Sequence, residues 1–233
     1  MNKTVQGIWS VSLWLLSLLF VWLVLAQHSF LYAQWYQLLN IDQTIEEYAP
    51  QNRFGRHNFT LTDDDERERL FAEIVVAIHQ EGNGLSSIEY RLPDNTTTPL
   101  LTNNEILHLQ DVASLIAVLT IVMKGVAIVF MASSFFLRQK NSVIAPLYKH
   151  WQYAGFLLLL LVTASMIFGV KNIFYWLHTL IFPKEHPWFF YYQDSLMSTL
   201  MQAPVIFLPI MLVLLSGTFL LWSVVLMFYR RLL

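Results

Sequence analysis

The chain contains four long stretches in which apolar residues follow one another with few polar interruptions. They cover roughly Ile8–Ala26, Val112–Leu137, Tyr153–Val170 and Pro204–Phe228. Each stretch has about 18 residues or more, and about 20 residues let a helix cross the hydrocarbon core of a bilayer. Because the stretches are distributed along the whole chain, the pattern predicts an all-α membrane protein with about four transmembrane helices.

The first stretch also has features of a cleaved signal peptide, since Val24–Ala26 is an acceptable processing site. Its apolar run exceeds the roughly 7–15 residues usual in such a peptide. Lys3 is the single positive charge ahead of it. We therefore expect this stretch to be retained as a transmembrane helix.

A polar segment of about 80 residues separates the first two stretches, which is too long for a bare connection. Within it, Phe59–Leu61 and Ile88–Leu92 have the composition of short strands. Asp63–Asp65 can cap a helix that Gly82 and Gly84 would end. Apolar residues at helical spacing lie between these signals: Leu70, Phe71, Ile74, Val75 and Ile78. The segment therefore predicts a small α/β subdomain.

The composition supports a membrane protein. Of 233 residues, 56% are hydrophobic and only 13% are charged, whereas a soluble domain carries about 25% charged residues. The net charge of -2 gives no indication of a nucleic-acid partner. The sequence has no cysteine, which excludes disulfides, thiolate catalysis and cysteine-ligated zinc.

The charged residues predict an orientation. All sixteen Asp and Glu residues lie between Asp42 and Asp111 or between Glu185 and Asp194. Basic residues without acidic neighbours occupy the opposite ends of the four stretches: Lys3, Arg138, Lys140, Lys149, Arg230 and Arg231. Because positive charges stay on the cytoplasmic side, both termini should be cytoplasmic and the polar segment should lie outside.

These patterns predict three parts. Residues 1–28 form the first transmembrane helix, and residues 29–104 form the extracytoplasmic α/β subdomain between the first and second spans. Residues 105–233 form a membrane portion of three helices, with a second outer loop at about 171–203.

Candidate catalytic residues lie just ahead of the second span. Thr102 followed by Glu105 is a capping box that begins a helix. His108 and Asp111 follow at a spacing that places them on one face of that helix. Asp111 could bind one ring nitrogen of His108 and leave the other as a base. It could equally be an acidic residue favoured by the helix dipole, and Glu105 could be a cap alone.

A second histidine lies in the aromatic segment after the third span. His178 follows that span directly, at about the depth expected for His108, and Pro183 and Pro187 should end any helix. Two histidines from separate segments at one level suggest a joint site, although an aromatic belt with incidental histidines is the alternative. Lys124 is a charge within a span, and such charges are candidates for function.

Two motifs resemble those of a known family. Glu105–Val112 reads E-x-x-H-x-x-D-V and resembles a signature of the lipoprotein intramolecular transacylases, which are bacterial membrane proteins with four helices. Thr179, where an acidic residue often occurs, and Pro187 suggest a divergent member. The second motif of the family resembles the series His178, Phe182, Trp188, Phe190, Asp194, Ser195 and Leu196.

The resemblance implies an activity. These enzymes move the sn-2 acyl chain of a diacylglyceryl-cysteine lipoprotein onto its own α-amino group, giving an N-acyl lyso-lipoprotein. By this resemblance the catalytic residues are His108, His178 and Asp111, and the candidates for substrate binding are Glu105, Trp188, Phe190 and Lys124. It implies a bacterial cytoplasmic membrane, lipoproteins and bilayer lipids as partners, and no cofactor or metal.

Three other functions fit the residues. The same two histidines could serve an acyltransferase that modifies a lipid or phospholipid with an intermolecular donor. His108, His178, His186 and Asp111 could ligate a metal, although no His-Glu-x-x-His motif is present. The outer subdomain could also belong to a non-enzymatic membrane assembly factor.

The predicted orientation can be tested by thiol labelling, because the chain has no cysteine of its own. Cysteines introduced at Asn95 and Lys184 should react with an impermeant thiol reagent added from outside. A cysteine at Asn141, between the second and third spans, should not react. Labelling at Asn141 alone would show that the orientation is inverted.

Overall fold

A computed structural model describes residues 3–140 and 145–232, so Asn141 lies outside the described residues. Within these ranges four helices are long and apolar enough to cross a membrane, which confirms the predicted number. They are α1 (Lys3–Gln27), α5 (Asn103–Gln139), α6 (Leu147–Phe168) and the greater part of α9 (Phe207–Leu232).

The chain forms two compact units. We call one the helical unit; it comprises Met1–Val21, Ile121–Pro183 and Leu215–Leu233. The other, the mixed unit, comprises Trp22–Thr120 and Lys184–Leu214. Each unit is therefore built from segments that are far apart in the sequence.

α5 continues from the capping box through the second span without interruption. Its 37 residues correspond to roughly 55 Å at about 1.5 Å per residue. The hydrocarbon core of a bilayer is only about 30 Å thick. The helix is therefore long enough for its first turns, which carry His108 and Asp111, to lie outside that core.

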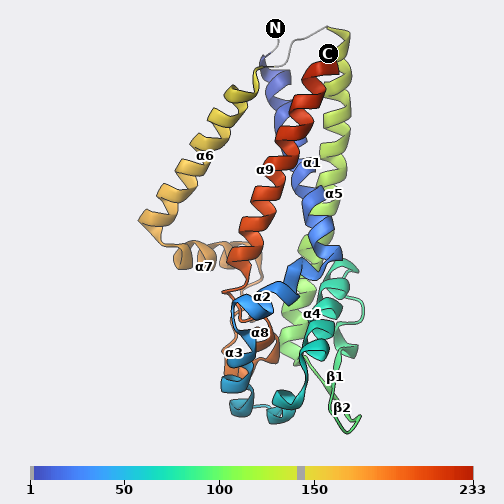
Figure 1. The fold of residues 1–233 in the computed structure, drawn as a ribbon, viewed down its shortest axis with the longest axis vertical. Coiled ribbons are helices and arrows are strands. Elements are labelled where there is room, and N and C mark those ends of the chain that lie inside the picture. The colour runs from blue at the N-terminus through green and yellow to red at the C-terminus, as the bar shows by residue number, and fades with distance from the viewer. Residues whose placement is uncertain (1–2, 141–144, 233) are drawn as a thin grey trace. The chain divides into compact units, whose positions relative to one another are not determined.

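The core of the helical unit is formed by α1, α5 and α9, which lie side by side (Figure 1). Trp9, Trp222 and Leu226 are buried there with Leu13 and Leu137, and the indole N–H of Trp9 donates to Ser134 Oγ at 2.9 Å. A Cβ at Gly217 would lie 3.0 Å from Val21 Cγ1. The glycine thus permits the close approach of α9 to α1.

α6 has no buried residue and stands away from α9 along most of its length (Figure 1). At Gly169, where φ is +77°, the chain turns into α7 (Val170–Ile181), a helix that the sequence had not indicated within the second outer loop. Phe182 is extended, because a residue before proline avoids helical geometry, and α7 ends ahead of Pro183 as predicted.

The mixed unit combines short helices with one hairpin. β1 (Glu89–Arg91) pairs antiparallel with β2 (Thr97–Pro99), and Tyr90 lies opposite Thr98. The α-helices that lie wholly in this unit are α2 (Tyr32–Leu38), α3 (Ile41–Tyr48), α4 (Asp64–His79) and α8 (Leu196–Leu200). Short 3-10 helices connect them at Ser29–Leu31, Ala49–Gln51, His57–Leu61, Leu85–Ser87 and Tyr192–Asp194.

α4 confirms the predicted helix of the outer subdomain. Asp63 caps it by accepting a hydrogen bond from the backbone N–H of Glu66 at 2.8 Å, and the chain leaves it through Gly82 at φ +83°. The buried face includes Phe71, whose ring stacks on Tyr32 of α2 with centroids 4.1 Å apart.

One of the two predicted strands is wrong. Phe59–Leu61 belongs to a 3-10 helix, because the N–H of Thr62 bonds back to the carbonyl of Phe59 and Phe59 turns its ring into the core. Ile88–Leu92 is confirmed as a strand over Glu89–Arg91. Its partner is the threonine-rich β2, which the pattern of apolar residues did not reveal.

Candidate functional site

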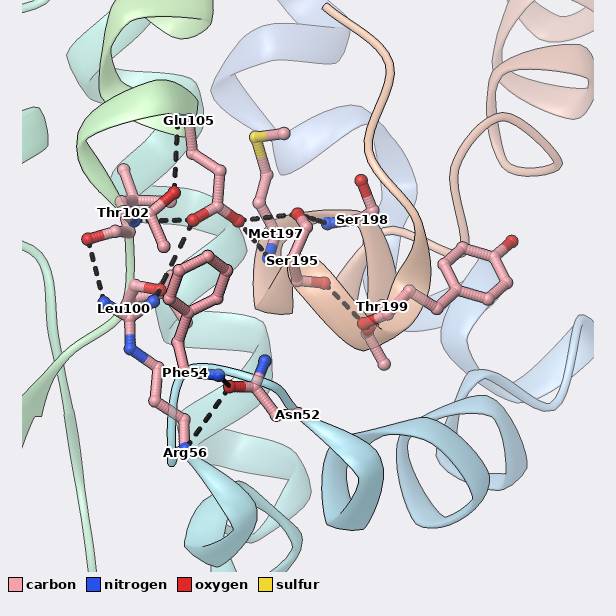
Figure 2. A network of polar contacts seen from close by, with 12 residues as sticks. Asn52, Phe54, Arg56, Leu100, Thr102, Glu105, Ser195, Met197, Ser198 and Thr199 are labelled. Atoms are coloured by element: carbon pink, nitrogen blue, oxygen red, sulfur yellow. Dashed lines mark hydrogen bonds and ion pairs between the residues drawn. The ribbon is translucent and has the colours of Figure 1, made fainter. Parts of the chain in front are cut away.

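The site begins with a fully buried carboxylate on the first turn of α5. Glu105 has no exposed surface, and its Oε2 accepts a hydrogen bond from the backbone N–H of Thr102 at 2.5 Å. The N–H of Glu105 in turn donates to Thr102 Oγ1 at 3.4 Å. The predicted capping box is therefore confirmed, and Figure 2 shows both bonds.

The other oxygen of Glu105 joins α5 to α8. Oε1 accepts hydrogen bonds from Ser195 Oγ at 2.6 Å and from the backbone N–H of Met197 at 3.1 Å. Ser195 Oγ also accepts from the N–H of Ser198 at 2.9 Å, which caps α8. Glu105 is thus held by groups from a segment 90 residues later in the chain (Figure 2).

Arg56 supplies a positive charge beside Glu105. Its Nη1 lies 3.9 Å from Glu105 Oε2, and the guanidinium also donates to the carbonyls of Leu100 at 2.9 Å and Leu101 at 3.2 Å. Asn52 Oδ1 accepts from the backbone N–H of Arg56 at 3.3 Å. Burial of a carboxylate costs free energy unless charge and hydrogen bonds compensate it, and this arrangement provides both.

His108 and Asp111 follow Glu105 along α5 at intervals of three residues. Asp111 Oδ2 lies 2.7 Å from His186 Nδ1, a partner that the sequence had suggested only within a metal site. The ring of His108 lies 6.0 Å from that of Phe190 between centroids. The structure thus brings His108, Asp111, His186 and Phe190 together within the mixed unit.

The contact with Asp111 determines which ring nitrogen of His186 donates a hydrogen bond. A carboxylate accepts hydrogen bonds, so the ring donates its Nδ1–H, and Nε2 is the nitrogen that can take up a proton. Trp188 and Phe190 follow in the same irregular segment and are half-buried. Phe189 lies between them, and 48% of its surface is exposed.

His178 and Lys124 belong to the helical unit. His178 Nδ1 lies 2.9 Å from the carbonyl oxygen of Phe174, so this nitrogen also donates and Nε2 is the basic one. The ring packs against Phe174 and Phe182, with centroids 3.9 and 5.3 Å away. Burial lowers the pKa of His178, which favours the neutral ring near neutral pH. Lys124 is exposed on α5.

The metal alternative required His108, His178, His186 and Asp111 to act together. Over residues 3–140 and 145–232, no group of three or more His, Cys, Asp or Glu residues is arranged to hold a metal ion. In the mixed unit Asp111 instead forms a pair with His186.

Comparison with known proteins identifies one family. The sequence model of the lipoprotein intramolecular transacylase Lit matches residues 7–203, a range that contains both motifs. No curated protein matches the sequence.

Solved structures of the membrane-integral lipoprotein intramolecular transacylase Lit from Bacillus cereus share the fold. One histidine variant has 18% identity and a TM-score of 0.67, with coverage of 100% of this chain and 94% of that one. A second histidine variant has 18% identity and a TM-score of 0.66, with 100% and 96% coverage. A further structure of this protein has 18% identity and a TM-score of 0.63, with 99% and 97% coverage.

Loss of the Glu105 carboxylate should destabilise the mixed unit. Glu105→Ala leaves Ser195, Met197 and Thr102 with buried donors, and each unsatisfied group costs about 1–3 kcal/mol. The midpoint of thermal unfolding in detergent should fall clearly for Glu105→Ala and less for Glu105→Gln, which keeps one acceptor oxygen. Glu46→Ala removes an exposed acid and is the matched control. An unchanged midpoint for Glu105→Ala would contradict this account.

Proposed function

This chain belongs to the lipoprotein intramolecular transacylase family Lit, and we propose that it transfers the sn-2 acyl chain of a diacylglyceryl-cysteine lipoprotein to the α-amino group of the same cysteine. The observation that carries the proposal is the match over residues 7–203. That range includes Glu105–Asp111 and His178–Asp194. The chain is accordingly an enzyme of the membrane, and the family name implies a lipoprotein as its substrate.

The proposed reaction needs no second substrate. The amine nitrogen attacks the ester carbonyl carbon, the new C–N bond forms, and the bond from that carbon to the glyceryl oxygen breaks. One proton leaves the nitrogen and one arrives at the oxygen, so the product is an isomer of the substrate. Because donor and acceptor belong to one molecule, much of the rate comes from holding it in a folded geometry.

We assign the proton transfers jointly to His108 and His178. Imidazole accepts and donates protons near neutral pH, and the free amine has a pKa of about 7.7–8.0. Burial lowers the pKa of His178, which supports a neutral, basic ring near neutral pH. Asp111 lies one turn after His108 on α5 and is proposed to orient His108.

Three of the four remaining candidates are proposed to bind the substrate. The half-buried aromatic rings of Trp188 and Phe190 suit an acyl chain. Lys124 is a charge within the second span, and such charges are candidates for function, so we propose that it meets a polar part of the substrate. Glu105 is engaged by protein groups on both oxygens, so we propose that it supports the site by holding α5 to α8.

The distribution of charge supports a location for the reaction. We propose that the protein lies in the bacterial cytoplasmic membrane with both termini in the cytoplasm, because the basic residues accumulate at those ends. Residues 29–104 would then form an extracytoplasmic subdomain, and the reaction would take place on the outer side.

The reaction can be tested with a synthetic diacylglyceryl-cysteine lipopeptide. The purified protein should yield an isomer of unchanged mass, and tandem mass spectrometry should place one acyl chain on nitrogen and one on glycerol. No phospholipid should be required, and a lipopeptide with an acetylated amine should not react. A product that gains the mass of a third acyl chain, only when phospholipid is supplied, would identify an intermolecular acyltransferase instead.

The two histidines should be needed for rate and not for folding. His108→Ala and His178→Ala should each lower the rate by roughly a hundredfold or more while the protein remains inserted in the membrane. His57→Ala and His150→Ala should be nearly neutral, and chelators should have no effect. Restoration of a chelated enzyme by zinc would support the metal alternative.

The rate should rise from acid towards neutral pH. The pKa of His178 is lowered, so its ring is already neutral and basic at a lower pH than an ordinary histidine ring. The upper part of the profile should therefore follow deprotonation of the amine, near about pH 8. A profile that falls between pH 6 and 8 would contradict the assignment of a histidine base.

A further inference from the structure

A hydrogen bond between side chains attaches an irregular segment to the helix that carries His108. Residues 182–191 form no helix or strand, and His186 in this segment bonds Asp111 of α5 at 2.7 Å. The two side chains are 32% and 18% exposed. The bond is therefore partly shielded from water, which makes it stronger than a contact on an open surface.

A second contact lies four residues later in the segment. The ring of Phe190 faces His108 at 6.0 Å between centroids. His108 precedes Asp111 by three residues on α5, whereas its partner Phe190 follows His186 by four residues. The segment therefore runs antiparallel to this turn of α5. The segment thus lies against this turn, with His186 at one end and Phe190 at the other.

We propose that His186 is a positioning residue whose Nδ1–H bond to Asp111 holds residues 186–190 against α5 and keeps Phe190 beside His108. The benefit for catalysis rests on the proposed transacylase function. The held segment also carries Trp188. Release of His186 would therefore loosen both aromatic rings that are proposed to receive the acyl chain.

Two substitutions distinguish holding from proton transfer. In His186→Asn, the side-chain amide can place an N–H close to the position of the histidine Nδ1–H, so the bond to Asp111 can persist. An amide does not exchange protons as imidazole does near neutral pH. In His186→Ala, both the bond and the titratable ring are lost.

The position of the segment can be measured without activity. Because the chain has no cysteine, Phe189→Cys provides one attachment point for a nitroxide, and Phe189 is 48% exposed. The label should be restrained with His186 present, more mobile in His186→Ala, and restrained again in His186→Asn. His57→Ala is the matched control, because His57 in the same unit also makes a bond of 2.7 Å through Nδ1, and it should not change the label.

The activity of the unlabelled proteins should follow the same order. With the lipopeptide substrate, kcat/KM should fall roughly tenfold or more in His186→Ala, as expected for loss of a hydrogen bond to a charged group. In His186→Asn, kcat/KM should stay within about threefold of the original, because the amide can keep the bond to Asp111. The pH profile of His186→Asn should keep its original shape.

Three results would overturn the proposal. A label that is equally restrained in His186→Ala would show that the bond does not hold the segment. Equal loss of activity in His186→Asn and His186→Ala, with the label restrained in His186→Asn, would show that the ring itself transfers protons. Full activity in His186→Ala with a mobile label would show that the held position does not serve the reaction. Inactivity of the unsubstituted protein would count against the proposed function, while the nitroxide would still report on the holding role.

Discussion

The buried carboxylate of Glu105 is the constraint on which the mixed unit depends. A charge without access to water costs several kcal/mol unless protein groups replace its hydration. Here the replacements come from the cap of α5, from the start of α8 and from Arg56. These three parts must assemble together, because each part alone would leave a polar group buried without compensation. The same requirement fixes the first turn of α5. His108 lies in the turn that comes next.

The turn after Glu105 carries two residues of the candidate site. The capping box and the network with Ser195 set where α5 begins, and helical spacing then places His108 and Asp111 on neighbouring positions. The later segment contributes His186 and Phe190 to the same turn. The helix α5 therefore fixes the positions of His108 and Asp111, and an irregular segment places aromatic side chains beside them.

Local signals in the sequence predicted much of this structure. Four spans, the cap at Asp63 and the capping box at Thr102 were all recognisable, because each depends on residues within a few positions of one another. The Glu105–Ser195 and Asp111–His186 contacts join residues that are 90 and 75 positions apart. No periodicity connects such positions, so the motif showed which residue types matter but not which partners they have. The error at Phe59–Leu61 has a related cause, since a short apolar run does not reveal whether a neighbouring strand exists.

The interrupted make-up of the mixed unit has a consequence for biogenesis. Its two segments, Trp22–Thr120 and Lys184–Leu214, are separated by the rest of α5, by α6 and by α7, so the first segment emerges from the ribosome well before the second. Until residues 195–198 arrive, Glu105 lacks the hydroxyl and amide donors that these residues provide. Completion of this unit is thus coupled to insertion of α6, and a nascent chain arrested before Lys184 would expose an incomplete polar network to quality-control proteases.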